Sequence, residues 1–370
     1  MNLGRDSTNQ KLINLIQAEI PVVERPFAAL GEKLGRSEAE VIERIDQLKA
    51  DKIIRQISAI FDTRSLGYAS SLVACKCDPQ RVGEVAAVIS QHPGVSHNYE
   101  RNHEFNLWYT IAVSPQSELG LEKTVERLHR QSGAQSTRLL PTLKLFKIGV
   151  RFDLSGENKA DEQTPPSYTE RNRGSLIPLT TLEIQFVRIL QRNLPIRPAP
   201  FVDYAREIGV SLAELQAIHA RFLKQGKMRR FAAVLNHRQV GFGANAMGVW
   251  AVRSEDDAAL TRIGAAMAGF RAVSHCYRRP TYPDWRYNLF TMVHGRSTTE
   301  CEQVLKAISD KTGVREYAAL YSTHEYKKVR VRYFTREELD WETKFRLDCG
   351  RCNSEGQAAD IFTRAKSIEA

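Results

Sequence analysis

The stretch IPVVERPF at residues 20–27 decides the fold, because it recurs as LPIRPAPF at residues 194–201. A second pair repeats at almost the same interval, since VSHNY at 95–99 returns as VSHCY at 273–277. Self-similarity at a long and nearly constant interval indicates that one structural plan is written twice. A chain of 370 residues is also long enough for several domains. We therefore predict a tandem duplication whose two copies are joined by a linker.

Each copy begins with a helical third that ends in a short alternating segment. In the first copy, residues 10–18 and 38–50 place apolar side chains at helical spacing, and Ser37 before an acidic first turn predicts an N-cap. Alternation at 54–61 then predicts a β-ribbon. Three helices followed by a two-stranded wing are typical of a winged helix-turn-helix. The second copy repeats this plan with helices near 179–192, 201–207 and 212–225 and a ribbon near 228–237.

The remainder of each copy predicts the order βαββαβ, which is that of a ferredoxin-like domain. In the first copy we expect strands near 69–77, 94–101, 105–113 and 137–150, with helices near 79–92 and 117–131. The second copy has the same pattern from about 244 to 334. The fold class is therefore α+β, as a tandem duplication of a winged helix-turn-helix and a ferredoxin-like module.

These patterns divide the chain into six parts. We expect winged helix-turn-helix domains at 1–66 and 179–240, ferredoxin-like domains at 67–152 and 241–334, a linker at 153–178 and a polar tail at 335–370.

The composition indicates a globular protein with an anionic partner. Hydrophobic residues make up 42% and charged residues 26%, and the formal net charge is +10. The sequence shows neither a membrane-spanning run nor a secretory signal, and six cysteines are too sparse for a disulfide framework, so we expect a cytoplasmic protein. We expect no metal site, because the pair Cys349 and Cys352 has no second pair nearby, and we place Cys75 and Cys77 in the core.

The charge of the two predicted recognition helices argues against DNA binding. A recognition helix that enters a groove needs basic and small polar residues on its outer face. The helix at 38–50 carries four acidic residues against two basic ones, and the helix at 212–225 has Glu214 in its first turn and is mostly apolar. We therefore interpret these helices as scaffold and do not expect DNA as a partner.

The last predicted strand carries a row of cations. Period two would place Lys328, Arg330 and Arg332 on one face together with Tyr326. Such a row suits a rigid ligand with several carboxylates, since Arg forms forked contacts and Lys acts as a point charge. The alternative is an edge strand that uses charge to prevent aggregation.

A second row occurs in both copies. His97, Tyr99 and Arg101 alternate on one predicted strand, and His275, Tyr277 and Arg279 do the same in the second copy. Three aromatic residues follow the second row and could stack on a flat ring: Tyr282, Trp285 and Tyr287. Either row alone could be an ordinary half-buried sheet surface, but their repetition favours a binding site.

A winged helix followed by a ferredoxin-like module resembles the Lrp/AsnC family of transcription regulators, in which the first module binds DNA and the second oligomerises and senses ligands. The segments HNYERNHEFNLW at 97–108 and HCYRRPTYPDWRYNLFTM at 275–292 resemble more narrowly the siroheme decarboxylases. Two Lrp-like subunits would here be fused in tandem, as in the branch of tetrapyrrole synthesis that makes haem d1.

The resemblance implies siroheme, a tetrapyrrole with eight carboxylates, as the ligand. It implies loss of two acetate carboxylates to give 12,18-didecarboxysiroheme, by an acid-assisted, non-redox reaction without a separate cofactor. His275 or His97 would be the proton donor or an iron ligand, and Tyr277 or Tyr282 a second acid. The cations should hold the carboxylates that survive, because an ion pair lost in the transition state raises the barrier.

The substrate-binding residues implied in this way are Arg279, Arg101, Lys328, Arg330, Arg332 and Trp285. Two other functions stay open on the sequence alone. One is a tetrapyrrole-sensing DNA-binding regulator, and the other is a partner subunit for another decarboxylase. The ferredoxin-like faces could also pair two chains into a homodimer.

Overall fold

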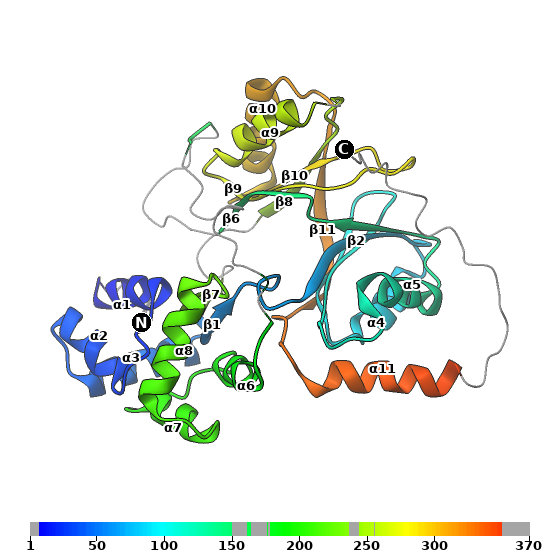
Figure 1. Ribbon diagram of the computed structural model, residues 1–370. Coiled ribbons are helices and arrows are strands. Elements are labelled where there is room, and N and C mark those ends of the chain that lie inside the picture. Colours follow the sequence, from blue (N-terminus) through cyan, green and yellow to red (C-terminus); the bar gives the residue numbers. More distant parts are fainter. Residues whose placement is uncertain are drawn as a thin grey trace. The chain divides into compact units, whose positions relative to one another are not determined.

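The computed structural model describes residues 7–149, 161–163, 176, 178–236, 244–254 and 256–349. The chain forms two compact units that do not follow the chain order. The first contains both predicted winged helix-turn-helix modules, and the second contains both ferredoxin-like modules (Figure 1). Most of the predicted linker and the end of the predicted tail lie outside the described residues.

Three helices from each copy build the first unit. They are α1 (Ser7–Ala18), α2 (Pro26–Leu34) and α3 (Glu38–Ala50) from the first copy, and α6 (Thr181–Leu190), α7 (Pro200–Glu207) and α8 (Leu212–Lys224) from the second. The predicted N-cap at Ser37 is confirmed, since its hydroxyl accepts from the backbone N–H of Glu40. The same capping box recurs at Thr180 and Ser211, so three helix starts are fixed by local sequence.

The wing of the first unit is shared between the copies. Strand β1 (Ile54–Phe61) pairs antiparallel with β7 (Met228–Leu235), with Ala59 opposite Phe231. The prediction of a separate two-stranded ribbon in each copy is therefore wrong. Each copy supplies one strand, and the backbone N–H and C=O groups along its edge pair with those of the equivalent strand of the other copy.

The second unit contains two βαββαβ modules, which confirms the predicted order. The first consists of β2 (Ala69–Lys76), α4 (Val82–Ser90), β3 (Val95–Arg101), β4 (Leu107–Val113), α5 (Gly120–Ser132) and β5 (Ser136–Pro141), followed by β6 (Lys144–Ile148). The second consists of β8 (Ala244–Trp250), α9 (Asp257–Ala268), β9 (Val273–Arg278), β10 (Leu289–Gly295), α10 (Thr298–Thr312) and β11 (Tyr317–Lys328), followed by α11 (Arg336–Cys349).

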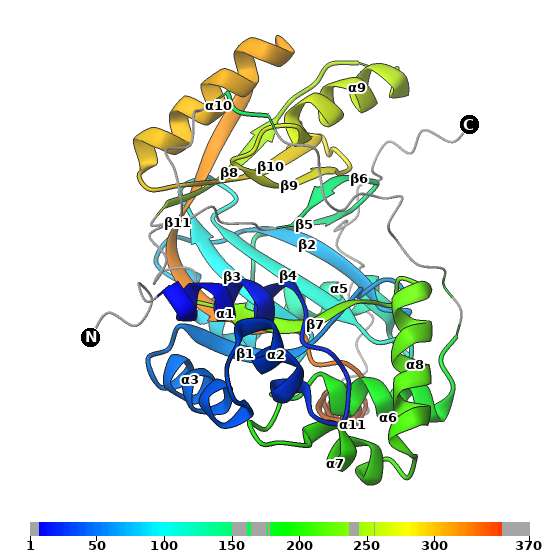
Figure 2. The same ribbon diagram turned by 90° about the vertical axis from the view of Figure 1, so that its left-hand side faces the viewer.

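The two modules exchange the ends of their last strands. The first five residues of β11 pair with β8 of their own module, and the rest of β11 pairs with β3 of the first module (Figure 2). In return, β6 leaves the first module and pairs with β9 of the second. The single strand predicted at 137–150 is therefore divided at Pro141, where the chain crosses from one module to the other. The result is one sheet in the order β5-β2-β4-β3-β11-β8-β10-β9-β6.

The sheet has an outer face covered by helices and an inner face with its own core. The outer clusters gather under α4 and α5 in the first module and under α9 and α10 in the second, and they contain the predicted core cysteines Cys75 and Cys77. The inner cluster draws side chains from both modules, including Trp108, Trp285 and Phe290. Because β5 and β6 stand at opposite ends of the strand order and are joined by only Thr142 and Leu143, the sheet curls around this inner core.

Two lysines fasten the exchanged strands to the helices of the other module. Lys327 on β11 donates to the carbonyls of Ser90 and His92 at the end of α4, at 2.6 and 3.1 Å. Lys147 on β6 donates to the carbonyl of Phe270 beyond α9, at 2.8 Å. Burial lowers the pKa of Lys147 to about 8. Both ammonium groups thus bind carbonyls at or just beyond the end of a helix, and those of His92 and Phe270 also accept a backbone N–H.

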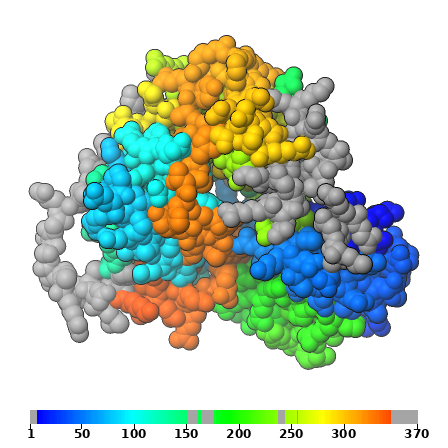
Figure 3. All heavy atoms as spheres, turned by 180° about the vertical axis from the view of Figure 1, so that it is seen from behind, coloured from blue at the N-terminus to red at the C-terminus, as the bar shows by residue number. Residues whose placement is uncertain are grey.

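Helix α11 packs on the first module. Glu338 accepts from the backbone N–H of Ser114 at 2.7 Å, and Glu342 accepts from that of Glu118 at 3.1 Å. Trp341 lies edge-on against the ring of buried His92, with centroids 4.3 Å apart. The red-orange surface of α11 and the orange surface of β11 both lie next to the cyan first module in Figure 3. The part of the predicted polar tail from Arg336 to Cys349 therefore belongs to the second unit.

The packing of the exchanged strand β6 on α9 can be tested at Gly264. A Cβ added there would lie 2.3–2.8 Å from three ring atoms of Phe146 on β6. Gly264→Ala should therefore destabilise the protein by about 1–3 kcal/mol, as overpacking does. The measurement is the midpoint of thermal unfolding.

Gly83→Ala on α4 is the matched control. A Cβ at Gly83 meets only the Tyr326 hydroxyl, at 4.0 Å. Since alanine is favoured over glycine inside a helix by about 0.5–1 kcal/mol, this variant should keep or raise the midpoint. Equal midpoints for the two variants would contradict the close packing of β6 on α9.

Candidate active site

The first predicted row lies on the inner face of the sheet. Asn98 points outward, because its amide donates to the carbonyl of Ala86 and the hydroxyl of Ser90 on α4. His97 and Tyr99 therefore point inward, with ring centroids 6.0 Å apart. The His97 Nδ1 lies 3.0 Å from the hydroxyl of Ser96.

The second row has the same geometry in the second module. Tyr277 lies directly opposite Phe290, a member of the inner core, so His275 and Tyr277 also face inward. Their ring centroids are again 6.0 Å apart. The His275 Nδ1 lies 2.7 Å from the hydroxyl of Ser274. The repeated rows predicted from the sequence are thus equivalent positions of the two modules.

Each row ends in a buried arginine that contacts the other module. Arg101 donates to the carbonyl of Leu320 at 3.0 Å, and Arg279 donates to the carbonyl of Leu140. The guanidinium of Arg279 also lies over the ring of Tyr277, 4.7 Å from its centroid. Both arginines therefore hold the junctions at which the last strands cross between modules.

The surroundings of these two arginines favour the binding of a negatively charged group beside each guanidinium. Burial lowers the pKa of Arg101 and of Arg279 to about 10. Among the described residues no carboxylate pairs with either guanidinium, and the Nε of each is buried without a hydrogen-bond partner. Buried charges in proteins are normally paired, so a ligand carboxylate would supply what the chain does not.

The structure places Tyr282 and Trp285 inside the core. The Tyr282 hydroxyl donates to the carbonyl of Leu139 at 2.5 Å, and burial raises its pKa. Trp285 is only 1% exposed, and its ring contacts those of Phe105 and Trp108. The faces of Trp285 are therefore occupied by protein side chains, and its indole N–H is buried without a partner.

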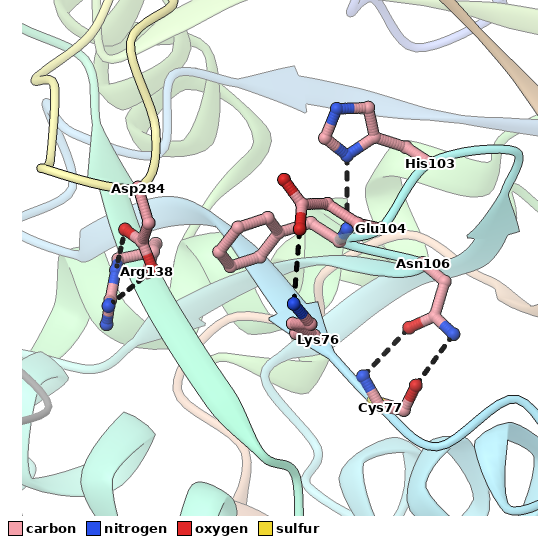
Figure 4. A network of polar contacts seen from close by, with 8 residues as sticks. Lys76, Cys77, His103, Glu104, Asn106, Arg138 and Asp284 are labelled. Atoms are coloured by element: carbon pink, nitrogen blue, oxygen red, sulfur yellow. Dashed lines mark hydrogen bonds and ion pairs between the residues drawn. The ribbon is translucent and has the colours of Figure 1, made fainter.

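A polar network fixes the loop that carries these aromatics (Figure 4). Arg138 on β5 makes two hydrogen bonds to Asp284, at 2.8 and 2.7 Å, and lies over the Tyr282 ring. The Arg138 side chain holds the pKa of Asp284 below its usual value. The contact joins strand β5 of the first module to the loop between β9 and β10 of the second. Sequence reasoning missed this pair, because no local pattern links the two positions.

The predicted cation row differs from a regular strand. A bulge between Glu325 and Lys327 breaks the alternation, so Tyr326 and Lys327 both pack toward α4 and are not on opposite faces. Lys328 lies opposite His97 and forms an ion pair with Glu325 at 3.5 Å. Strand β11 ends there, whereas Arg330 and Arg332 follow it, the latter in the first unit. The prediction of one strand face with three aligned cations is therefore wrong.

No group of three His, Cys, Asp or Glu side chains that could hold a metal occurs within the described ranges. Cys352 and the side chain of Cys349 lie outside them. None of the helices described is long and apolar enough to cross a membrane.

Comparison with known families agrees with this architecture. The AsnC-like ligand binding domain matches residues 65–147 and 239–327. The siroheme decarboxylase NirDL-like HTH domain matches residues 9–55 and 183–229. The fold and the matches together define a duplicated protein of helix-turn-helix and AsnC-like ligand-binding modules.

Relatives narrow this class. The chain is 40% identical to a siroheme decarboxylase from Hydrogenobacter thermophilus over 332 residues, which cover 90% of this chain and 96% of the relative. It is similar to the crystal structure of the siroheme decarboxylase NirDL, with a TM-score of 0.74, 36% identity and coverage of 93% and 100%. A beta subunit from Methanosarcina barkeri is 44% identical over 150 residues, 40% of this chain and 97% of that subunit. The chain belongs to the siroheme decarboxylase family, and the regulator alternative is not favoured.

The contacts of Tyr282 predict a structural role for its hydroxyl. Tyr282→Phe removes the hydrogen bond to Leu139 and should lower stability by about 1 kcal/mol, the usual net value of one such bond. The thermal midpoint measures this. An unchanged midpoint together with a large loss of decarboxylation would instead identify Tyr282 as the second acid considered above.

Proposed function

We propose that this chain removes the carboxylates of two acetate side chains of siroheme, giving 12,18-didecarboxysiroheme. The observation that carries the proposal is the pair of half-buried, inward-facing rows in a chain that belongs to this family. A solved relative, NirDL in complex with an iron-uroporphyrin III analogue, has a TM-score of 0.73 and 35% identity, and the match covers 93% of this chain. That ligand is also a tetrapyrrole with carboxylate side chains.

The roles of the residues follow from their chemistry. Arg101 and Arg279 would bind carboxylates that survive the reaction, because each is buried beside a row without an acidic partner. Lys328 is a third candidate beside His97, with Arg330 and Arg332 next along the chain. We propose Trp285 as support for the pocket, since its faces are already covered.

The reaction needs an acid and no electron acceptor. Loss of carbon dioxide leaves an electron pair on the carbon beside the macrocycle, and a proton must reach that carbon to form the methyl group. Histidine titrates near neutral pH and is suited to this task, with Tyr277 as the neighbouring phenol. The macrocycle belongs to the substrate, so we propose that no separate cofactor takes part.

Three broader expectations stay predictions. They are a cytoplasmic location, the absence of DNA from the partners, and pairing of the chain with a second copy. Salt-dependent retention on duplex DNA would contradict the second, because phosphate contacts weaken steeply as salt rises.

Anaerobic incubation of the purified chain with siroheme tests the function. We expect release of two carbon dioxide molecules per siroheme and a product of the corresponding mass. His275→Ala should lower kcat by about 100-fold or more, the usual contribution of a general acid. His324→Ala, which changes an exposed histidine on β11, is the control and should keep the wild-type rate. An inert wild-type chain would refute the proposal.

The charge on Arg279 is expected to act in substrate binding. Arg279→Met should raise KM by about 10- to 100-fold, since a hydrogen bond to a charged group contributes about 1.5–3 kcal/mol. Arg279→Lys keeps the charge and should fall between Met and wild type.

Arg278→Met is the matched control, because the neighbouring Arg278 pairs with Asp257 on α9. It should leave KM unchanged. An unchanged KM in Arg279→Met would remove Arg279 from the binding residues.

A further inference from the structure

The two rows are equivalent in backbone position, but their surroundings differ. Lys328 lies opposite His97, and the bulge places Glu325 opposite Tyr99. At the equivalent positions of β6, Ile148 lies opposite His275 and Leu145 lies opposite Tyr277. The row of the first module is therefore flanked by charges, whereas that of the second is flanked by aliphatic side chains.

The hydrogen bonds behind the two histidines differ as well. In the second module, the Ser274 hydroxyl lies 2.7 Å from His275 Nδ1 and 2.7 Å from His294 Nε2, both closer than its third contact, the carbonyl of Met292 at 3.3 Å. His294 Nδ1 then lies 2.6 Å from Asn245 Oδ1, and Asn245 is exposed. These contacts form a continuous chain from the inward-facing His275 to the protein surface.

The contacts of the equivalent serine in the first module are different. The Ser96 hydroxyl lies 3.0 Å from His97 Nδ1 and 2.8 Å from the hydroxyl of Thr110, which itself lies 3.4 Å from His97 Nδ1. The position equivalent to His294 is Ala112. The backbone N–H of His294 donates to the carbonyl of Ala272, two residues before Ser274, and that of Ala112 donates to the carbonyl of Gly94, two residues before Ser96. No second imidazole therefore stands behind His97 at this position.

The contacts of the second module suit proton transfer in one direction. When His294 is protonated, its Nε2–H donates to the Ser274 oxygen, and the Ser274 hydroxyl donates to His275 Nδ1. When His275 Nε2 gives its proton to the inner face, Nδ1 takes one from the Ser274 hydroxyl, and Ser274 takes one from His294. A turn of the His275 ring then brings the new N–H to the inner face for the second acetate. The residues paired with His275 and Tyr277 on β6 are aliphatic, and the cation of this row, Arg279, lies over Tyr277. This arrangement suits a reacting acetate at His275, because a cation paired with the departing carboxylate in the ground state would raise the barrier.

We propose that His275 is the acid of the reaction and that Ser274 and His294 form a relay that returns protons to it from solvent. This inference rests on the proposed function. His97, with Lys328 and Arg101 nearby, then lies where surviving carboxylates bind. Ser274 and His294 do not touch the reacting atoms, so they are positioning residues.

The proton balance of the step is as follows. The bond between the acetate methylene carbon and its carboxyl carbon breaks, carbon dioxide leaves, and the electron pair passes to the methylene carbon conjugated with the macrocycle. A proton from His275 Nε2 forms the third C–H bond of the new methyl group. Each carboxylate lost therefore consumes one proton from water, delivered through the relay, and nothing is oxidised or reduced.

His294→Gln distinguishes a relay from a structural contact. An amide can still hydrogen-bond to Ser274 and Asn245, but it does not have the two ring nitrogens by which an imidazole gains one proton and loses another. We expect this variant to lower kcat by about 10-fold, a part of what a general acid contributes, with KM within twofold of wild type. His294→Ala should be equally slow and should regain activity when imidazole is added to the buffer.

Ser274→Ala and Ser96→Ala test the asymmetry between the copies. Each removes the hydroxyl beside a row histidine, but only Ser274 leads onward to a second imidazole. We expect kcat of Ser274→Ala to be at most a third of that of Ser96→Ala. Thermal midpoints and binding of siroheme, followed by its absorbance, show whether each variant is folded and loaded.

The outcomes separate the relay from the function itself. A wild-type chain that releases no carbon dioxide from siroheme refutes the proposed function. A wild-type chain that is active, with His294→Gln as fast as wild type or Ser96→Ala as slow as Ser274→Ala, refutes the relay and leaves the function standing. Failure of imidazole to restore any activity to a folded, siroheme-binding His294→Ala also refutes the relay.

Discussion

The second unit depends on backbone hydrogen bonds that neither module can complete alone. In each module the second strand, β3 or β9, stands at the edge of a four-stranded sheet, and an unpaired edge is costly or prone to aggregation. The extension that covers each edge comes from the last strand of the other module, held by Lys327 or Lys147. These crossings also bring Leu320 and Leu140 to the buried arginines. The positions of the histidine rows, the arginines and the inner core therefore all depend on the crossing of the last strands between the modules.

Duplication supplies equivalent positions, and small substitutions then make them different. Ala112 and His294 occupy the same backbone position, as do Lys328 and Ile148. The row of the first module therefore lies beside a charge, whereas the row of the second lies beside an aliphatic side chain and has an imidazole behind it. A symmetric scaffold can thus present an asymmetric ligand with different chemistry on its two sides. Siroheme requires such a distinction, since two carboxylates leave and the others remain.

Local sequence predicted most of the elements but few of the contacts between copies. Capping at Ser37, the helical spacing of α3 and the alternation of β3 and β9 are properties of short segments, so they were visible directly. The inward-facing rows followed from the same alternation. The division at Pro141, the bulge near Tyr326 and the pair of Arg138 with Asp284 depend on long-range partners, and no local pattern reports them. The sequence predicts that Trp285 could stack on a flat ligand, but it does not show that Phe105 and Trp108, which are distant in sequence, cover its ring.

The exchanged strands also give an advantage to having both modules on one polypeptide. A half-length chain such as the Methanosarcina barkeri beta subunit matches only 40% of this one. If halves of this kind interlock as the two modules do here, their assembly must follow mass action and weaken on dilution. Fusion turns that encounter into an intramolecular one with an effective concentration that is independent of expression level. It also fixes a one-to-one ratio of the two halves, so that the unlike partners are always made together.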